Sequence, residues 1–263
     1  MKKIYLLLLF IGSIGNAKVS SNNAVKVSKI EYYQLKTYVL KTAQQEQSTD
    51  QFLKEAYLPA LKRLGLKNIG VFKPRTIATD TLKKIIVLIP FASMDQFLSL
   101  DEKLGKDKNY ANAGKTFLTT DYLNPTYVRI ESILLKAFAD HPFITPSPLE
   151  SLRSERVYEL RSYESATEPI YKAKVDMFNA GGEINLFKQL GFNAVFYGEV
   201  LSGAKMPNLM YMTTFANQES RDAHWKSFSE SEEWKKMSNL DCYKNTVSHM
   251  DILFLNPTEY SDY

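Results

Sequence analysis

The sequence predicts an α+β protein in which two tandem βαββαβ units form an α/β barrel with the helices outside. The first observation is an internal repeat: RVYELRSY at 156–163 resembles EYYQLKTY at 31–38, an offset of 125 residues. The similarity continues from LKRLGLKNIGVF at 61–72 to FKQLGFNAVFYG at 187–198. A repeat of about 120 residues is too long for a solenoid unit and indicates a duplicated domain. The second observation is that both halves show the same order of elements.

In the first half, alternating side chains predict a strand at 30–39, and a helix follows at 49–65. Ser48, Thr49 or Asp50 is expected to cap this helix, and Pro59 must kink or restart it. The remaining elements are two strands, a helix and a last strand, near 68–74, 83–91, 93–104 and 126–135.

The second half repeats this order, with elements at 156–164, 169–190, 192–201, 208–216, 217–229 and 246–255. Gly181 and Gly182 are expected to interrupt its first helix. Between the halves, residues 141–154 contain three prolines and predict an extended linker. We therefore expect a first domain at 28–140 and a second at 155–263.

The first 17 residues, MKKIYLLLLFIGSIGNA, have the pattern of a cleavable secretory signal peptide. Their apolar run is too short to span a bilayer. Cleavage near Ala17 predicts a periplasmic or secreted protein with a flexible segment at 18–27 and no stable membrane anchor. Removal of Lys2 and Lys3 lowers the formal net charge from +4 to +2. Because no dense basic cluster remains, nucleic acid is not an expected partner.

Several kinds of chemistry are disfavoured. Cys242 is the only cysteine, which excludes an intramolecular disulfide and a lipoprotein anchor. The three histidines, His141, His224 and His249, lack the short spacing of metal ligands, so we expect no metal site and no cofactor. The GKT at 114–116 lacks the earlier glycine of a phosphate loop, and no Rossmann fingerprint is present.

The repeated strands place alternate side chains on opposite faces of each sheet. In the first half, Tyr33 and Leu35 share the face that we expect to cover the helices. Lys36 and Tyr38, together with Gln34, are expected to face the barrel interior.

In the second half, the same alternation assigns Glu159, Arg161 and Tyr163 to the interior. The last strands add Arg129 and Glu131 in one half and His249 and Asp251 in the other. Unpaired buried charges are costly, so the two polar faces are expected to meet and pair their charges inside a semi-polar barrel.

Three motifs resemble the NIPSNAP family: VYELRSY its opening strand, HWKSFSESEEW at 224–234 its second helix, and ILFLNPTEYS at 252–261 its closing strand and tail. The resemblance covers about residues 155–262. It implies a ferredoxin-like fold of the dimeric α/β-barrel type, closed within one chain or across a homodimer. The first half departs from it, with Leu100, Asp101 and Tyr110 where the second half has His224, Trp225 and Trp234.

The favoured function is binding of a small organic ligand in the barrel cavity. The candidate ligand-binding residues are Glu159, Arg161, Tyr163, Trp225, Lys36 and Tyr38. One alternative is a protein-interaction module with a fully packed barrel, in which the same charges form a structural ion-pair network. The other alternative is a cofactor-independent oxygenase or isomerase, since related folds host such enzymes. Its candidate catalytic residues are His249, His224 and Asp251, and no specific reaction is predicted.

Overall fold

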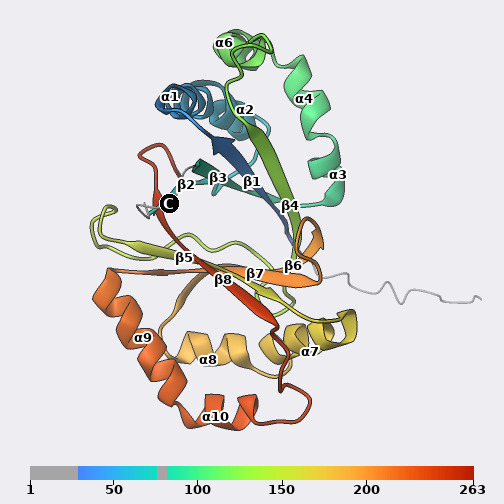
Figure 1. Ribbon diagram of the computed structural model, residues 1–263, viewed down its shortest axis with the longest axis vertical. Helices are drawn as coiled ribbons and strands as arrows, with labels where there is room; N and C mark the ends of the chain where they lie inside the picture. Colours follow the sequence, from blue (N-terminus) through green and yellow to red (C-terminus); the bar gives the residue numbers. More distant parts are fainter. Residues whose placement is uncertain (1–28, 76–81) are drawn as a thin grey trace, which may run out of the picture.

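The computed structural model describes residues 29–75 and 82–263. The predicted signal peptide at 1–17 and the predicted flexible segment at 18–27 lie outside the described residues. Eight antiparallel strands form a closed barrel in the order β1-β3-β2-β8-β5-β7-β6-β4, and the helices lie outside it in two groups (Figure 1). The predicted fold class is confirmed, and the barrel closes within one chain.

Each half is one βαββαβ unit. The elements of the first half are β1 (Tyr32–Leu40), α1 (Ala43–Phe52), the π-helical turn η1 (Leu53–Tyr57), α2 (Leu58–Arg63), β2 (Gly70–Pro74), β3 (Lys83–Phe91), α3 (Met94–Leu98), α4 (Leu100–Lys106), α5 (Lys108–Ala113), α6 (Lys115–Leu118) and β4 (Arg129–Ala137). Those of the second half are β5 (Val157–Glu164), α7 (Glu168–Phe178), α8 (Glu183–Gln189), β6 (Asn193–Ser202), β7 (Asn208–Phe215), α9 (Gln218–Glu230), α10 (Glu232–Ser238) and β8 (His249–Pro257).

The first helix begins earlier than predicted. Thr42 is extended, and its side chain accepts a hydrogen bond of 3.1 Å from the backbone N–H of Gln45, so Thr42 is the cap. The prediction of Ser48, Thr49 or Asp50 as the cap is wrong. Pro59 restarts the helix after η1, as expected for a residue that cannot donate a backbone hydrogen bond.

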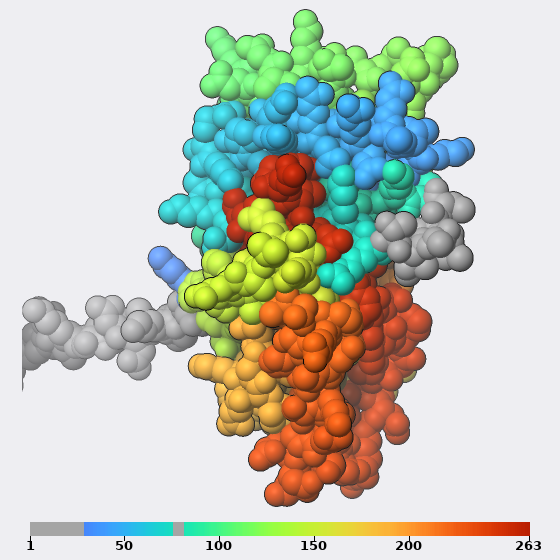
Figure 2. All heavy atoms as spheres, turned by 90° about the vertical axis from the view of Figure 1, so that its left-hand side faces the viewer, coloured from blue at the N-terminus to red at the C-terminus, as the bar shows by residue number. Residues whose placement is uncertain are grey.

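Two seams join the halves. At one seam β2 pairs with β8 over three residues, from Phe72 opposite Pro257 to Pro74 opposite Leu255. At the other, β4 pairs with β6, and a bulge shifts the register beside Leu134. The linker and the C-terminal tail also lie side by side across the junction (Figure 2), where Arg153 donates to three backbone oxygens of the tail.

The core has three layers: one inside the barrel and one between each sheet and its helices. Tyr33, Leu35, Tyr158 and Leu160 lie inside the barrel, a region that we call the lumen. Tyr38 and Tyr163 lie on the helix side instead. The predicted assignment of the two sheet faces is therefore wrong.

Lys36 and Arg161 face the helices because aromatic rings of the helix layers contact their positive charges. Lys36 lies over the ring of Tyr57 in one half, and Arg161 lies over the ring of Trp225 in the other. The interior of an eight-stranded barrel is only wide enough for side chains to fill it or for one small ligand. None of the helices in the described part of the chain combines the length and the apolar character of a membrane-spanning segment.

Candidate functional site

The predicted ligand-binding residues of the second half form a buried network beneath α9. The Glu159 carboxylate accepts hydrogen bonds from Arg161 Nε at 2.6 Å, Arg221 Nε at 2.8 Å and Trp225 Nε1 at 3.0 Å. The guanidinium carbon of Arg161 lies 3.6 Å from the centre of the Trp225 ring system. Tyr163 accepts from Arg161 at 3.0 Å.

This network is enclosed: the side chains of Glu159 and Arg161 are 0% and 9% exposed. Burial alone would raise the pKa of Glu159, but the hydrogen bond from Arg221 and the charges of Arg161 and Arg221 outweigh it and lower the pKa. The sequence had led us to expect that these charges pair across the barrel. They are instead paired within the second half. Their geometry is that of a structural ion-pair network, and a role in ligand binding stays a prediction.

Lys36 and Tyr38 lie beneath the helices of the first half. The Lys36 ammonium is 4.9 Å from the centre of the Tyr57 ring and 5.6 Å from that of Tyr38. Burial lowers the pKa of Lys36, and the charge of Asp101 opposes this only in part. No carboxylate of the described residues lies within 4.0 Å of its ammonium nitrogen.

His224 covers a helix surface. Its Nδ1 lies 2.6 Å from the backbone oxygen of Ser220, and its ring packs against Phe192 and Phe215. It therefore lies in the helix layer of the second half, away from the lumen residues.

The lumen is mostly apolar but contains unsatisfied polar groups. The hydroxyls of Tyr158 and Tyr263 are buried and have no hydrogen-bond partner among the described residues, whereas the buried Tyr33 hydroxyl lies beside the Glu31 carboxylate. The exposed fractions of Tyr33, Tyr158 and Tyr263 are 0%, 0% and 3%. Phe72 contacts two of them, with ring centres 5.1 Å from Tyr158 and 5.7 Å from Tyr263.

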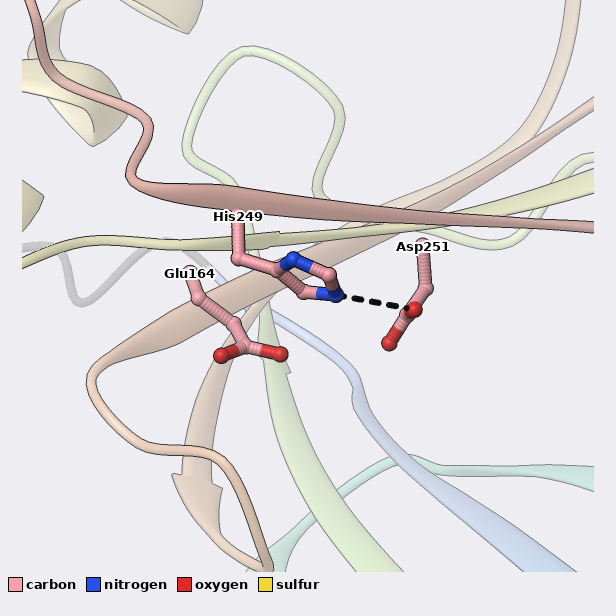
Figure 3. A group of neighbouring side chains, drawn as sticks. All are labelled: Glu164, His249 and Asp251. Atoms are coloured by element: carbon pink, nitrogen blue, oxygen red, sulfur yellow. Dashed lines mark hydrogen bonds and ion pairs between the residues drawn. The ribbon is translucent and has the colours of Figure 1, made fainter.

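His249 and Asp251 lie at the start of β8, opposite the end of β5. We call this end of the lumen the mouth. They share the inner face of β8 with Leu253 and Leu255, which pack in the lumen cluster. Glu164 lies directly opposite His249 on β5, and all three side chains project to the same side of the sheet (Figure 3). Lys205, in the turn between β6 and β7, pairs with Asp251 and lies 3.6 Å from Glu164.

The prediction that His249 and Asp251 lie on the same face of the sheet as Arg161 is wrong, because the register between β5 and β8 differs by one residue from the one that it requires. Asp251 pairs with Ser162, and Ile252 pairs with Arg161. A shift of one residue moves a side chain to the opposite face of the sheet. The hydrogen bond from Lys205 lowers the pKa of Asp251, burial opposes this, and the hydrogen bond from His249 adds to the lowering.

A groove of about 1140 Å³ lies on the outside of the barrel. It lies between α1 with η1 and the ends of β2, β3 and β8, and charged side chains line much of it. Lys73 bonds to Glu46 at 2.9 Å and to Asp50 at 2.6 Å across its floor. Leu253 lines the groove and also packs against the lumen cluster.

The closed eight-stranded barrel, built from two βαββαβ units with the helices outside, defines a ferredoxin-like α/β-barrel protein. Residues 158–262 match the model of the NIPSNAP family. This match confirms the resemblance that the motifs of the second half predicted. The match includes Glu159, Arg161, Arg221 and Trp225 of the buried network and His249 and Asp251 at the mouth.

Three solved structures resemble the chain. A candidate monooxygenase from Lactobacillus acidophilus has a TM-score of 0.55 and 9% identity over 87% of this chain and 94% of that one. An anthrone oxidase-like protein has a TM-score of 0.51 and 9% identity over 88% of this chain and 92% of that one. These two likenesses show the shared fold alone.

A NIPSNAP family protein from Agrobacterium tumefaciens aligns with 41% of this chain and 97% of its own, at 17% identity and a TM-score of 0.36. A search of curated protein sequences finds no match.

Sequence reasoning missed several members of these clusters. Arg221 could have been found, because it lies four residues before Trp225 and therefore on the same helix face. Glu164 continues the face of Tyr158 and Leu160 to the end of its strand. Lys205 could not have been predicted from the sequence, because only the fold of the β6–β7 turn brings it to the mouth.

Proposed function

We propose that the protein binds a small organic molecule in the lumen of its barrel. The observation that carries this proposal is the pair of buried hydroxyls of Tyr158 and Tyr263, which have no hydrogen-bond partners among the described residues. A buried hydroxyl that makes no hydrogen bond costs about 1–3 kcal/mol. Two such groups in one lumen, with the Tyr33 hydroxyl on the same lining, favour a polar atom of a ligand as their partner.

The lining indicates the chemical class of the ligand. Leu35, Leu160 and Met212 surround the lumen with apolar side chains, whereas Tyr33 and Tyr158 supply hydroxyls. Ligand sites of this kind combine an apolar wall with a few oriented polar groups. The expected ligand is a compact aromatic or alicyclic molecule that carries a carbonyl or hydroxyl group.

The seam between β2 and β8 supports a route of entry. β2 pairs with β8 over Phe72–Pro74, and the backbone N–H of Arg75 donates to the oxygen of Phe254 at 2.8 Å. The pairing seen in the described residues thus ends beside Leu253, which borders both the outer groove and the lumen. A ligand that enters through the groove would reach the lumen past Leu253.

The test is thermal unfolding with a panel of aromatic ketones, quinones and phenols. The wild-type chain is expected to unfold at a higher temperature with at least one compound. Tyr158→Phe should reduce that rise, because the ligand loses a hydrogen bond, while its ligand-free unfolding temperature stays equal or increases. Tyr171→Phe is the matched control, since the Tyr171 hydroxyl is also buried but lies on α7, beside Glu199 and outside the lumen.

Two results would refute the proposal. One is that no compound in the panel raises the unfolding temperature of the wild-type chain. The other is that Tyr33→Phe and Tyr158→Phe both leave the ligand-induced rise unchanged.

A second candidate function is a cofactor-independent oxygenase or isomerase. The observation that favours it is the hydrogen bond of 3.1 Å between His249 Nε2 and Asp251 Oδ1 at the mouth. An imidazole oriented by a carboxylate is a suitable general base. His224 does not meet this requirement of position, since it packs in a helix layer. Turnover that is unchanged in His249→Gln would exclude this role for His249.

We also propose that the protein acts after export. The basic start, apolar run and small residues of MKKIYLLLLFIGSIGNA support this proposal. N-terminal sequencing of the protein recovered from its native compartment should begin near Lys18. A chain that retains Met1 or Lys2 in the cytoplasm would contradict it.

A further inference from the structure

A second cluster of polar side chains lies at the mouth, outside the proposed ligand site in the lumen, and it includes the His249–Asp251 pair of the second candidate function. We propose that Glu164, His249 and Asp251 bind a divalent metal ion of the zinc class. The inference concerns the mouth alone and does not rest on the proposed function of the lumen.

The backbone of two neighbouring strands fixes the three ligands. Glu164 lies opposite His249 in the β5–β8 register, and Asp251 follows His249 by two residues on the same face (Figure 3). Their potential ligand atoms all lie within 4.8 Å of one another. The ligands of a tetrahedral ion with bonds of about 2.1 Å lie about 3.4 Å apart, so small side-chain rotations would close the site.

Two further observations point to a cation at this position. Glu164 Oε1 is buried and makes no hydrogen bond among the described residues, and its ion-pair partner, the Lys205 ammonium, lies at a long 3.6 Å. The ammonium of Lys205 already lies between the two carboxylates, bonded to Asp251 and 3.6 Å from Glu164. A cation is therefore electrostatically favoured there, and a divalent ion would replace a single positive charge with two.

Lys205 is able to leave. It lies in the turn between β6 and β7 and its side chain is 53% exposed. Its ammonium would therefore be rehydrated when it moves away from the carboxylates.

The donor set indicates the class of metal. One imidazole nitrogen and two carboxylate oxygens suit Zn²⁺ and similar first-row ions better than Ca²⁺ or Mg²⁺, which take oxygen ligands. Three protein ligands leave at least one position for water or another small ligand. His249 is 57% exposed, so the ion would have direct access from solvent.

The test is isothermal titration calorimetry of the untagged full chain with zinc chloride in a buffer that does not chelate zinc. Wild type is expected to bind one zinc ion. His249→Ala should weaken binding by about tenfold or more, since even changes to outer-shell groups cost about 10–100-fold. Lys205→Met should tighten binding, because the competing cation is gone. His224→Gln is the control, and it should leave zinc affinity unchanged because His224 lies in a helix layer.

The response to Lys205→Met separates a metal site from an ion-pair cluster. If neither wild type nor Lys205→Met binds zinc, the proposal is wrong. It is equally wrong if His249→Ala and Glu164→Gln both bind zinc as wild type does, since the ion then lies elsewhere. Circular dichroism shows which variants are folded, and Asp251→Asn replaces any that is not.

Discussion

The two halves of the barrel place a cation at the same position of the same strand but surround it differently. Arg161 of β5 lies beneath α9, where Glu159, Tyr163 and Trp225 all contact it. Lys36 of β1 corresponds to Arg161 in the repeat, yet it has only aromatic rings around its ammonium and no carboxylate within ion-pair distance among the described residues.

The difference can be traced to single positions. Where the second half has Glu159, the first has Gln34, which bonds to Ser132 at 2.8 Å. Where the second half has Trp225, the first has Asp101, whose charge acts on Lys36 from a distance. The same backbone therefore supports a fully paired network in one half and an unpaired cation in the other. The fold requires apolar packing in both halves, but it does not require the network.

The largest expected effect is the removal of the central carboxylate. Glu159→Gln leaves Arg161 buried without its counter-charge, while the half-buried Arg221 keeps only Asp222. Breaking a buried pair in this way costs about 3–5 kcal/mol. The midpoint of urea unfolding should fall accordingly. Gln34→Ala, at the equivalent position of the first half, should cost about 0.5 kcal/mol or less. Equal effects in the two halves would show that the network adds no stability.

The same carboxylate predicts a dependence on pH. Because its folded pKa is lowered, Glu159 stabilises the fold at pH values above its unfolded pKa of about 4.3, and this stability is lost as the pH falls through the folded pKa. The difference in stability between wild type and Glu159→Gln should therefore be largest near pH 7 and shrink toward pH 3. Urea unfolding at several pH values measures it. A difference that stays constant across this range would contradict the lowered pKa.

The sequence was sufficient to predict the order of strands and helices, because the repeat showed each element twice and apolar alternation marks strands. It was not sufficient to choose which face of a strand meets the lumen. Tyr33 and Lys36 each combine an apolar body with a polar end, so hydrophobicity alone does not separate them. The choice depends on rings such as Tyr57 and Trp225, which come from helices distant in the sequence.

The register between strands was also beyond the sequence. His249 and Asp251 were correctly placed on one face, but their neighbours on β5 follow from a pairing that no local pattern encodes. Glu164 and Lys205 join them only through that pairing and through the turn before β7. The residues of the mouth could be predicted singly from strand alternation, but not as a cluster.

A smaller effect is expected for the aromatic partner of the network. Trp225→Phe removes the hydrogen bond to Glu159 and weakens the contact of the ring with Arg161, for a loss of about 1–2 kcal/mol. Trp234→Phe is the matched control, because Trp234 packs against Phe228 and does not touch Glu159. Urea unfolding compares the two variants. An equal loss in both would mean that only ring volume matters at Trp225.

The smallest expected effect is a gain in the first half. Burial lowers the pKa of Lys36, so this side chain costs the full amount of stability at pH values below its folded pKa. The cost shrinks as the pH rises above the folded pKa and is gone above the unfolded pKa of about 10.4. Lys36→Met should stabilise the protein at pH 7 by roughly 0.5–1 kcal/mol, once the lost attraction to the Tyr57 ring is subtracted. The gain should shrink at alkaline pH, where wild-type Lys36 is neutral.

Arg161→Met should do the opposite and destabilise the second half, because it leaves Glu159 with fewer counter-charges. If both substitutions change the urea midpoint in the same direction, the two cations have equivalent surroundings, and the contrast between the halves is not an energetic one.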